Sequence, residues 1–267
     1  MPCGQLWLIP TPLGENSDPH RVLPADTLAV IEALDYFVVE NARTARAFLK
    51  AVGTRTPLQA LTLRELSEHT PPEAIPALLA PILEGRDAGV LSEAGAPGVA
   101  DPGAALVAAA HAAGVVVRPL IGPSALLLAL MASGLNGQRF AFAGYVPVAA
   151  PARLQRLREL ERRSADEDET VLIIETPYRN QALFDAALQA LSPTTRLLVA
   201  SDLSLQGEHI RTDTVDAWRR RAPTVPRTPT VFGLQATRRV PAAARAKETS
   251  RTNETSRAST ASRRQRR

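Results

Sequence analysis

The residues with the clearest potential for chemistry lie in one glycine-rich segment, Gly89 to Gly103, which reads GVLSEAGAPGVADPG. It carries two carboxylates, Glu93 and Asp101, among residues that favour turns. Glycine lets the backbone approach a ligand where a Cβ atom would collide, and carboxylates accept hydrogen bonds from hydroxyl groups such as those of a ribose. The segment therefore predicts a ligand-binding loop, with an ordinary glycine-rich connection as the alternative.

Short apolar runs lead into this loop and into two others. The run before Ser92 is typical of a strand covered on both faces, Gln5–Ile9 leads into Pro10 to Gly14, and Val115–Leu120 leads into Gly122-Pro123-Ser124. Pro123 suits a first helical position, and the amide groups of that helix start could face a ligand oxygen; a plain helix start is the alternative. Loops at the carboxyl ends of such strands form ligand sites.

The wider pattern predicts two α/β units. Strands are expected at 5–9, 36–39, 57–63, 89–92, 115–120, 140–147, 171–174, 197–201 and 230–234, with an alternating segment at 208–215. Helices are expected from about 25 to 34, 42 to 51, 72 to 83, 104 to 113, 123 to 133, 151 to 163 and 178 to 191. We predict a mostly parallel sheet flanked by helices in 1–137, a mixed α+β unit in 138–237, and a disordered basic tail in 238–267.

Charge separates the tail from the body. The chain of 267 residues has a net charge of +4, but residues 238–267 contain ten Lys or Arg against two Glu, so the remainder carries −4. A basic segment of this kind increases encounter with polyanions such as RNA, and a solubilising extension is the equal alternative. The single cysteine, Cys3, excludes an internal disulfide framework and fits a cytoplasmic location. No metal site, leader sequence or membrane partner is expected, because the four histidines are scattered and no long apolar segment is present.

Eight motifs in order resemble the tetrapyrrole methylase superfamily and, within it, the group of ribosomal RNA small-subunit methyltransferases I. The matching segments are LIPTPLG (8–14), VVENARTARAFL (38–49), SEH (67–69), LSEAGAPGVADPG (91–103), LIGPSALLLALMASGL (120–135), RFAFAGYVP (139–147), ETPYR (175–179) and ASDLSLQGEHIRT (200–212). The resemblance implies a two-domain tetrapyrrole-methylase-like fold, usually a homodimer. It also implies 2′-O-ribose methylation of 16S rRNA in the 30S subunit with S-adenosylmethionine, and no DNA partner.

The resemblance also implies site residues. The cofactor is expected at Pro12, Leu13, Gly14, Glu93, Ala94, Gly95, Val99, Ala100, Pro123, Ser124, Ala125 and Glu175. The substrate-side candidates are Glu40, Arg43, Glu68 and His69, for which strand-end capping and ordinary surface charge are the alternatives.

Several motifs depart from the family's usual residues. Glu93 stands for the usual Asp, Ala96 for Thr and Ala100 for Ser, and the usual R-E-L-T-K is Ser201-Asp202-Leu203-Ser204-Leu205. Two alternatives to an rRNA enzyme therefore remain open: a methyltransferase acting on a tetrapyrrole or other small molecule, and a diverged paralogue that binds cofactor or RNA without turnover.

Overall fold

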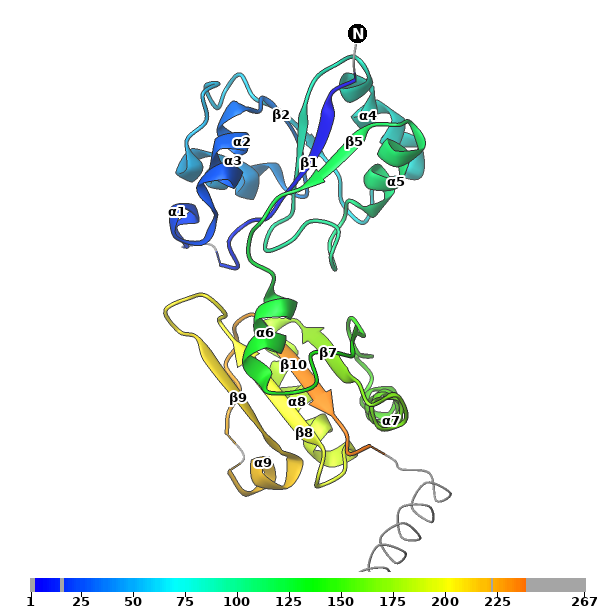
Figure 1. Cartoon of the computed structure of the whole chain (residues 1–267). Coiled ribbons are helices and arrows are strands. Elements are labelled where there is room, and N and C mark those ends of the chain that lie inside the picture. Colours follow the sequence, from blue (N-terminus) through cyan, green and yellow to red (C-terminus); the bar gives the residue numbers. More distant parts are fainter. Residues whose placement is uncertain (1–2, 15–16, 222, 239–267) are drawn as a thin grey trace, which may run out of the picture.

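The protein consists of two lobes, each built on a five-stranded sheet (Figure 1). The computed structural model describes residues 3–14, 17–221 and 223–238, so the predicted basic tail lies outside the described residues except for Arg238. The segment between β5 and α6 joins the lobes. No helix of the described residues is long and apolar enough to cross a membrane.

The first lobe contains a parallel sheet in the order β3-β2-β4-β1-β5. Its strands are β1 (Gln5–Ile9), β2 (Tyr36–Val39), β3 (Thr62–Glu65), β4 (Ala88–Leu91) and β5 (Val116–Pro119). Its helices are α1 (Pro19–Val22), α2 (Ala25–Ala33), α3 (Ala42–Val52), α4 (Ile75–Leu83) and α5 (Ala104–Ala112), with a 3-10 turn at Pro72–Ala74. Since the strands are parallel, their carboxyl ends all reach the same edge of the sheet.

Both faces of this sheet are covered because neighbouring side chains of a strand point in opposite directions. Val38 of β2 packs with α4 and α5, while Phe37 and Val39 of the same strand pack with α2 and α3. Every residue of β2 and β4 is buried. This burial explains the unbroken apolar runs that identified the strands in the sequence.

The second lobe contains a mixed sheet in the order β6-β7-β10-β8-β9. Its strands are β6 (Phe140–Phe142), β7 (Thr170–Glu175), β8 (Arg196–Ser201), β9 (His209–Thr214) and β10 (Thr230–Gln235). Its helices are α6 (Ala125–Ser133), α7 (Ala150–Glu167), α8 (Asn180–Ala190) and α9 (Val215–Arg221), with a 3-10 turn at Pro177–Arg179. Only the β6–β7 pair is parallel among these strands, so the predicted mixed sheet is confirmed.

Helix α6 belongs by its packing to the second sheet. Ala129 and Leu130 of α6 lie in one apolar cluster with Leu198 of β8 and Val231 of β10. Leu13, from the loop after β1, joins the same cluster and so connects the two lobes. The unit boundary at residues 137/138 stays a prediction, and this packing favours a boundary before α6.

Some elements differ from the sequence expectations. The strand expected at 57–63 is β3 at Thr62–Glu65, because pairing with β2 sets its register. The strand expected at 140–147 ends at Phe142, and Gly144 then adopts a positive φ of 69°. Helices α1 and α9 were not predicted, since each is only four to seven residues long.

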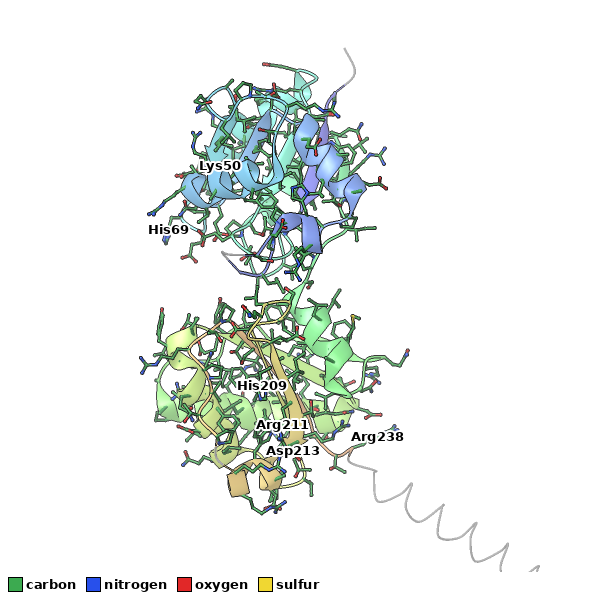
Figure 2. All side chains as sticks on the ribbon, turned by 90° about the vertical axis from the view of Figure 1, so that its left-hand side faces the viewer. Lys50, His69, His209, Arg211, Asp213 and Arg238 are labelled. Atoms are coloured by element: carbon green, nitrogen blue, oxygen red, sulfur yellow. The ribbon has the colours of Figure 1, made fainter. Side chains whose placement is uncertain are left out.

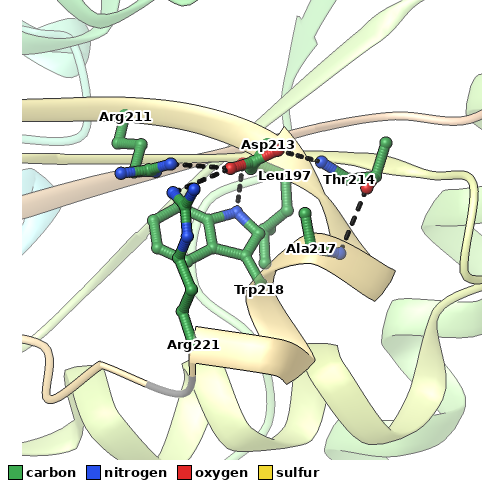
Figure 3. Close-up of polar contacts among 7 residues, drawn as sticks. All are labelled: Leu197, Arg211, Asp213, Thr214, Ala217, Trp218 and Arg221. Carbon is green, nitrogen blue, oxygen red and sulfur yellow. Dashed lines mark hydrogen bonds and ion pairs between the residues drawn. The ribbon is translucent and has the colours of Figure 1, made fainter.

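Helix α9 is held to the sheet by a cluster around Trp218 (Figure 3). The Trp218 indole Nε1 donates to the Leu197 carbonyl oxygen at 2.8 Å, and its ring meets Phe184 edge-on at a centroid distance of 5.3 Å. The guanidinium carbon of Arg211 lies over the indole, 5.5 Å from the ring centroid. Arg211 Nη2 forms an ion pair with Asp213 Oδ2 at 2.9 Å. Trp218 is 3% exposed, so its side chain belongs to the apolar core of the second lobe.

Trp218→Phe is expected to lower the free energy of unfolding by about 1–3 kcal/mol, because it removes the indole hydrogen bond and leaves unfilled volume. Urea denaturation followed by circular dichroism measures this change. Arg221→Gln is the matched control: it removes only an exposed 3.5 Å ion pair to Asp213, which should cost less than about 1 kcal/mol. Equal losses in the two variants would contradict the assignment of Trp218 as the anchor of α9.

Candidate active site

Three loops converge at the carboxyl ends of β1, β4 and β5. The loop after β1 and the loop after β4 are joined by a short antiparallel bridge between Thr11 and Gly95. Thr11 N donates to Gly95 O at 2.8 Å, and Gly95 N donates to Thr11 O at 3.1 Å. Thr11 Oγ1 also donates to the Ser92 carbonyl oxygen at 3.4 Å. The two loops are therefore fixed to each other by a pair of backbone hydrogen bonds and by the Thr11 hydroxyl.

Glycine is required at two positions where these three loops meet. Gly95 has a φ of 80°, and a Cβ atom there would lie 3.3 Å from Leu13 Cδ2. A Cβ atom on Gly122 would lie 2.5 Å from Pro10 Cβ, which belongs to a rigid ring. Pro123 follows directly, and its carbonyl oxygen is the next nearest atom to the Gly95 position. The third loop can thus approach the first two only because these residues have no side chain.

A cavity of about 900 Å³ opens beside these loops. Its floor is formed by residues 11–14 after β1 and 91–94 at the end of β4, and one wall is the face of α3 that carries Arg43 and Phe48. Leu205 and Pro229 of the second lobe also line the cavity. The volume is in the upper part of the range for small-molecule sites, about 300–1,000 Å³.

Six of the predicted site residues line this cavity: Pro12, Leu13, Gly14, Arg43, Glu93 and Ala94. Leu13 is at the same time packed between the lobes. Thr44 Oγ1 donates to Glu93 Oε1 at 3.4 Å, which connects α3 to the loop after β4. The structure therefore brings the first loop, the glycine-rich loop and the start of α3 into one site.

The other predicted residues lie around the cavity or away from it. Gly95 is held in the bridge to Thr11, and Pro123 lies beside it, with Ser124 and Ala125 beginning α6. Val99 and Ala100 are exposed in the turn beyond the bridge, where Ala100 has a φ of 65°. Glu68 and His69 are paired with each other at 3.6 Å, with 83% and 87% of their side chains exposed, and they do not line the cavity (Figure 2).

Several carboxylates lie close together in and beside the glycine-rich loop. Glu40 Oε2, at the end of β2, accepts a hydrogen bond from the Glu93 backbone N at 3.3 Å. Burial raises the pKa of Glu40, and the nearby carboxylates of Glu93 and Glu68 raise it further, against the lowering effect of that hydrogen bond. Burial raises the pKa of Asp101 to about 6, with Glu40 as the main charged neighbour, while a hydrogen bond from Ser92 lowers it. Asp101 is thus a carboxyl that titrates near neutral pH.

The second lobe brings Glu175 and Tyr145 toward this group. The Glu175 side chain is fully buried. Its Oε1 forms an ion pair with Arg179 Nη2 at 2.5 Å and accepts a hydrogen bond from Thr176 N at 2.7 Å. Its Oε2 is buried without a hydrogen-bond partner in the part of the chain that the structure describes. Burial raises the pKa of Tyr145, followed by the charges of Asp101 and Glu175. Groups from both lobes therefore share one electrostatic environment.

Sequence reasoning missed three contributors. Phe48 lies four residues after Thr44, which places the two side chains on one face of the helix. Leu205 and Tyr145 come from the second lobe, and nothing in the sequence relates them to the loops of the first. Among the described residues no group of three or more His, Cys, Asp or Glu side chains is arranged to hold a metal ion.

Comparison with known proteins identifies the family. The family model described as tetrapyrrole (corrin/porphyrin) methylases matches residues 6–218. The chain belongs to this family. It is 35% identical over 212 residues to the ribosomal RNA small subunit methyltransferase I of Mesorhizobium japonicum, covering 79% of this chain and 68% of the relative. The protein of that name from Escherichia coli O157:H7 is 30% identical over 207 residues, covering 78% and 68% of the two chains. The prediction of a methyltransferase is confirmed.

Solved structures confirm the predicted tetrapyrrole methylase fold. The methyltransferase CobJ superposes with a TM-score of 0.56 at 21% identity, covering 89% of this chain and 97% of CobJ. A conserved hypothetical protein from Aeropyrum pernix K1 superposes with a TM-score of 0.63 at 16% identity, covering 88% and 85% of the two chains. The fold of this chain is therefore shared by proteins that have low sequence identity to it.

Gly122→Ala is expected to lower the free energy of unfolding by about 1–3 kcal/mol, because the new methyl group meets the Pro10 ring and the loops must separate. Chemical denaturation measures the loss. Gly137→Ala is the matched control, since a Cβ atom there has nothing within 4 Å, and it should change stability by less than about 0.5 kcal/mol. A Gly122→Ala protein as stable as the control would show that the loops do not need this close approach.

Asp101→Asn is expected to change how stability depends on pH. A carboxyl with a pKa raised from 3.8 to about 6 in the folded protein binds its proton more tightly when folded, so its contribution to stability falls as the pH rises through that window. The variant lacks this pH-dependent loss of stability. The difference in melting temperature, variant minus parent, should therefore rise between pH 4 and pH 6 and stay constant above pH 6. Asp166→Asn, on an exposed position of α7, is the control, and parallel curves for all three proteins would contradict the raised pKa.

Proposed function

We propose that the chain transfers a methyl group from S-adenosylmethionine to a ribose 2′-hydroxyl of 16S rRNA in the small ribosomal subunit. The observation that carries the proposal is the cavity between the lobes, which is lined by the first loop and the glycine-rich loop of a tetrapyrrole methylase family member. Relatives at 30–35% identity over about four fifths of the chain bear the name ribosomal RNA small subunit methyltransferase I. A cytoplasmic location, where ribosomal RNA is found, and the absence of a DNA partner belong to the same proposal.

The residues around the three loops fit S-adenosylmethionine. Glu93 lines the cavity, and the buried Glu175 Oε2 has no hydrogen-bond partner among the described residues. Both carboxylates are acceptors suited to a ligand that carries positive charge and hydroxyl groups. The cofactor-binding set that we propose comprises Pro12, Leu13, Gly14, Glu93, Ala94, Gly95, Val99, Ala100, Pro123, Ser124, Ala125 and Glu175. When bound, the cofactor supplies an activated methyl group on a positively charged sulfur.

The protein's own task is to position the hydroxyl and to accept its proton. Alignment of reactants contributes effective molarities of about 10⁵ M or more, whereas a general base contributes about 10²–10⁴-fold. Arg43 at the cavity supplies a cation for the RNA backbone. Burial raises the pKa values of Glu40 and Asp101, and for Asp101 to about 6, which makes these carboxylates stronger proton acceptors. We retain Glu68 and His69 as substrate-side candidates outside the cavity, where they would contact RNA beyond the target nucleotide.

A homodimer is part of the proposal. Apolar side chains are exposed on and beside α6, including Ile121 at 77%, Leu127 at 51% and Met131 at 80%. On β5, at the edge of the first sheet, Val116 is 51% exposed. Exposed apolar side chains grouped in this way are typical of protein interfaces.

Methyl transfer to undermethylated 30S subunits, measured with tritiated S-adenosylmethionine, tests the reaction and the substrate. We expect label in 16S rRNA at the 2′-oxygen of one nucleotide, located by nuclease digestion, and none in a free tetrapyrrole. The acidic body of the chain favours the second candidate, a small-molecule substrate, and label in the tetrapyrrole alone would establish it. Cofactor binding with no transfer to either substrate would indicate a paralogue without turnover.

Calorimetry with S-adenosylmethionine tests the cofactor site separately. Glu175→Gln should weaken binding about tenfold or more, because a charged acceptor is replaced by a neutral one. Glu167→Gln is the control, since within the described ranges Glu167 forms a single ion pair, at the surface, with Arg139 at 2.7 Å. No cofactor binding by the parent protein would refute the proposed function.

A further inference from the structure

The wall of the cavity formed by α3 has no role in the cofactor set. Six residues of this helix line the cavity: Arg43, Thr44, Ala45, Ala47, Phe48 and Ala51. They follow the helical period and so form one continuous face. Because the same cavity reaches the first loop and Glu93 at its inner end, whatever lies along α3 lies next to the proposed cofactor site. A substrate must lie next to the cofactor to receive the methyl group, so this wall is suited to contact it.

The chemistry of this face suits single-stranded nucleic acid. Phe48 presents a partly buried aromatic ring, and Ala47 and Ala51 beside it are exposed and small, which leaves room over the helix. Aromatic rings in grooves bind single strands because every base can stack on them. Recognition of RNA by proteins is directed mainly to such unpaired bases.

Cations flank the same face. Helix α3 carries Arg43, Arg46 and Lys50 and no acidic residue, although the body of the chain is acidic. Arg43 and Lys50 are seven residues apart, which places them on one side of the helix about 10.5 Å apart along its axis. Both are exposed, and neither forms an ion pair with another described residue (Figure 2 labels Lys50). They are free to contact phosphates.

We propose that α3 forms an RNA subsite in which a base next to the target nucleotide stacks on Phe48 while backbone phosphates contact Arg43 and Lys50. The inference rests on the proposed function and adds the path of the RNA strand. It places the strand along α3, from the end of the helix that carries Lys50 toward the end at which Thr44 contacts Glu93. The arrangement also gives an acidic body a local group of cations for a polyanion, because α3 carries three basic residues and no acidic one.

Fluorescence anisotropy with a labelled single-stranded RNA, recorded over a series of salt concentrations, separates stacking from phosphate contacts. Phe48→Leu should weaken RNA binding about tenfold with an unchanged salt dependence, because only stacking is lost. Phe48→Tyr should restore the affinity, since the ring is kept. Lys50→Gln and Arg43→Gln should each reduce the slope of log K against log salt by about 0.7, the value for one phosphate contact on a single strand.

Arg158→Gln is the matched control, because Arg158 is an exposed cation on α7 in the second lobe. The affinity for S-adenosylmethionine should be the same in Phe48→Leu, Lys50→Gln and the parent protein, and melting curves should show that both variants are folded at the assay temperature. RNA affinities and slopes of Phe48→Leu and Lys50→Gln equal to those of Arg158→Gln would overturn the subsite while leaving the proposed function intact. A parent protein that binds S-adenosylmethionine but no RNA would overturn both.

Discussion

The structure depends on the close approach of three loops at one edge of a parallel sheet. The Thr11–Gly95 bridge fixes two of them through backbone hydrogen bonds, and Gly122 lets the third come within contact of Pro10. A parallel sheet brings its strand ends to one edge, but only residues without side chains let the loops after them touch. The position of the cavity, the orientation of Glu93 and the start of α6 all follow from this contact.

The same convergence sets the electrostatics of the site. Removing carboxylates from water raises their pKa values, and carboxylates close to one another raise them further. Glu40 follows β2, whereas Glu93 and Asp101 belong to the glycine-rich loop after β4, and the packing places all three together. Glu175 and Tyr145 extend the group into the second lobe. A cationic ligand between the lobes would relieve this repulsion, so ligand binding and the approach of the lobes are physically coupled.

Leu13 and α6 show how the two lobes are connected. Leu13 belongs to a ligand loop of the first sheet but packs in the apolar cluster of the second, together with α6. The segment from β5 to α6 joins the two lobes, and Leu13 packs against the start of the second lobe beside it. The site is consequently a property of both lobes, although most of its residues come from the first.

The sequence by itself determined the succession of elements, the parallel first sheet, the mixed second sheet and the loops that carry the site, because apolar periodicity and glycine or proline positions are local signals. It also indicated Arg43, Glu93 and the residues from Pro12 to Gly14, which line the cavity. Only the tertiary structure decided the extent of β3, the packing of α6 on the second sheet, and the exposure of Glu68 and His69 away from the cavity. It alone joined Tyr145 and Glu175 to Asp101, and turned one face of α3 toward the loops. These features depend on contacts between residues far apart in the chain, and such contacts leave no periodic trace in the sequence.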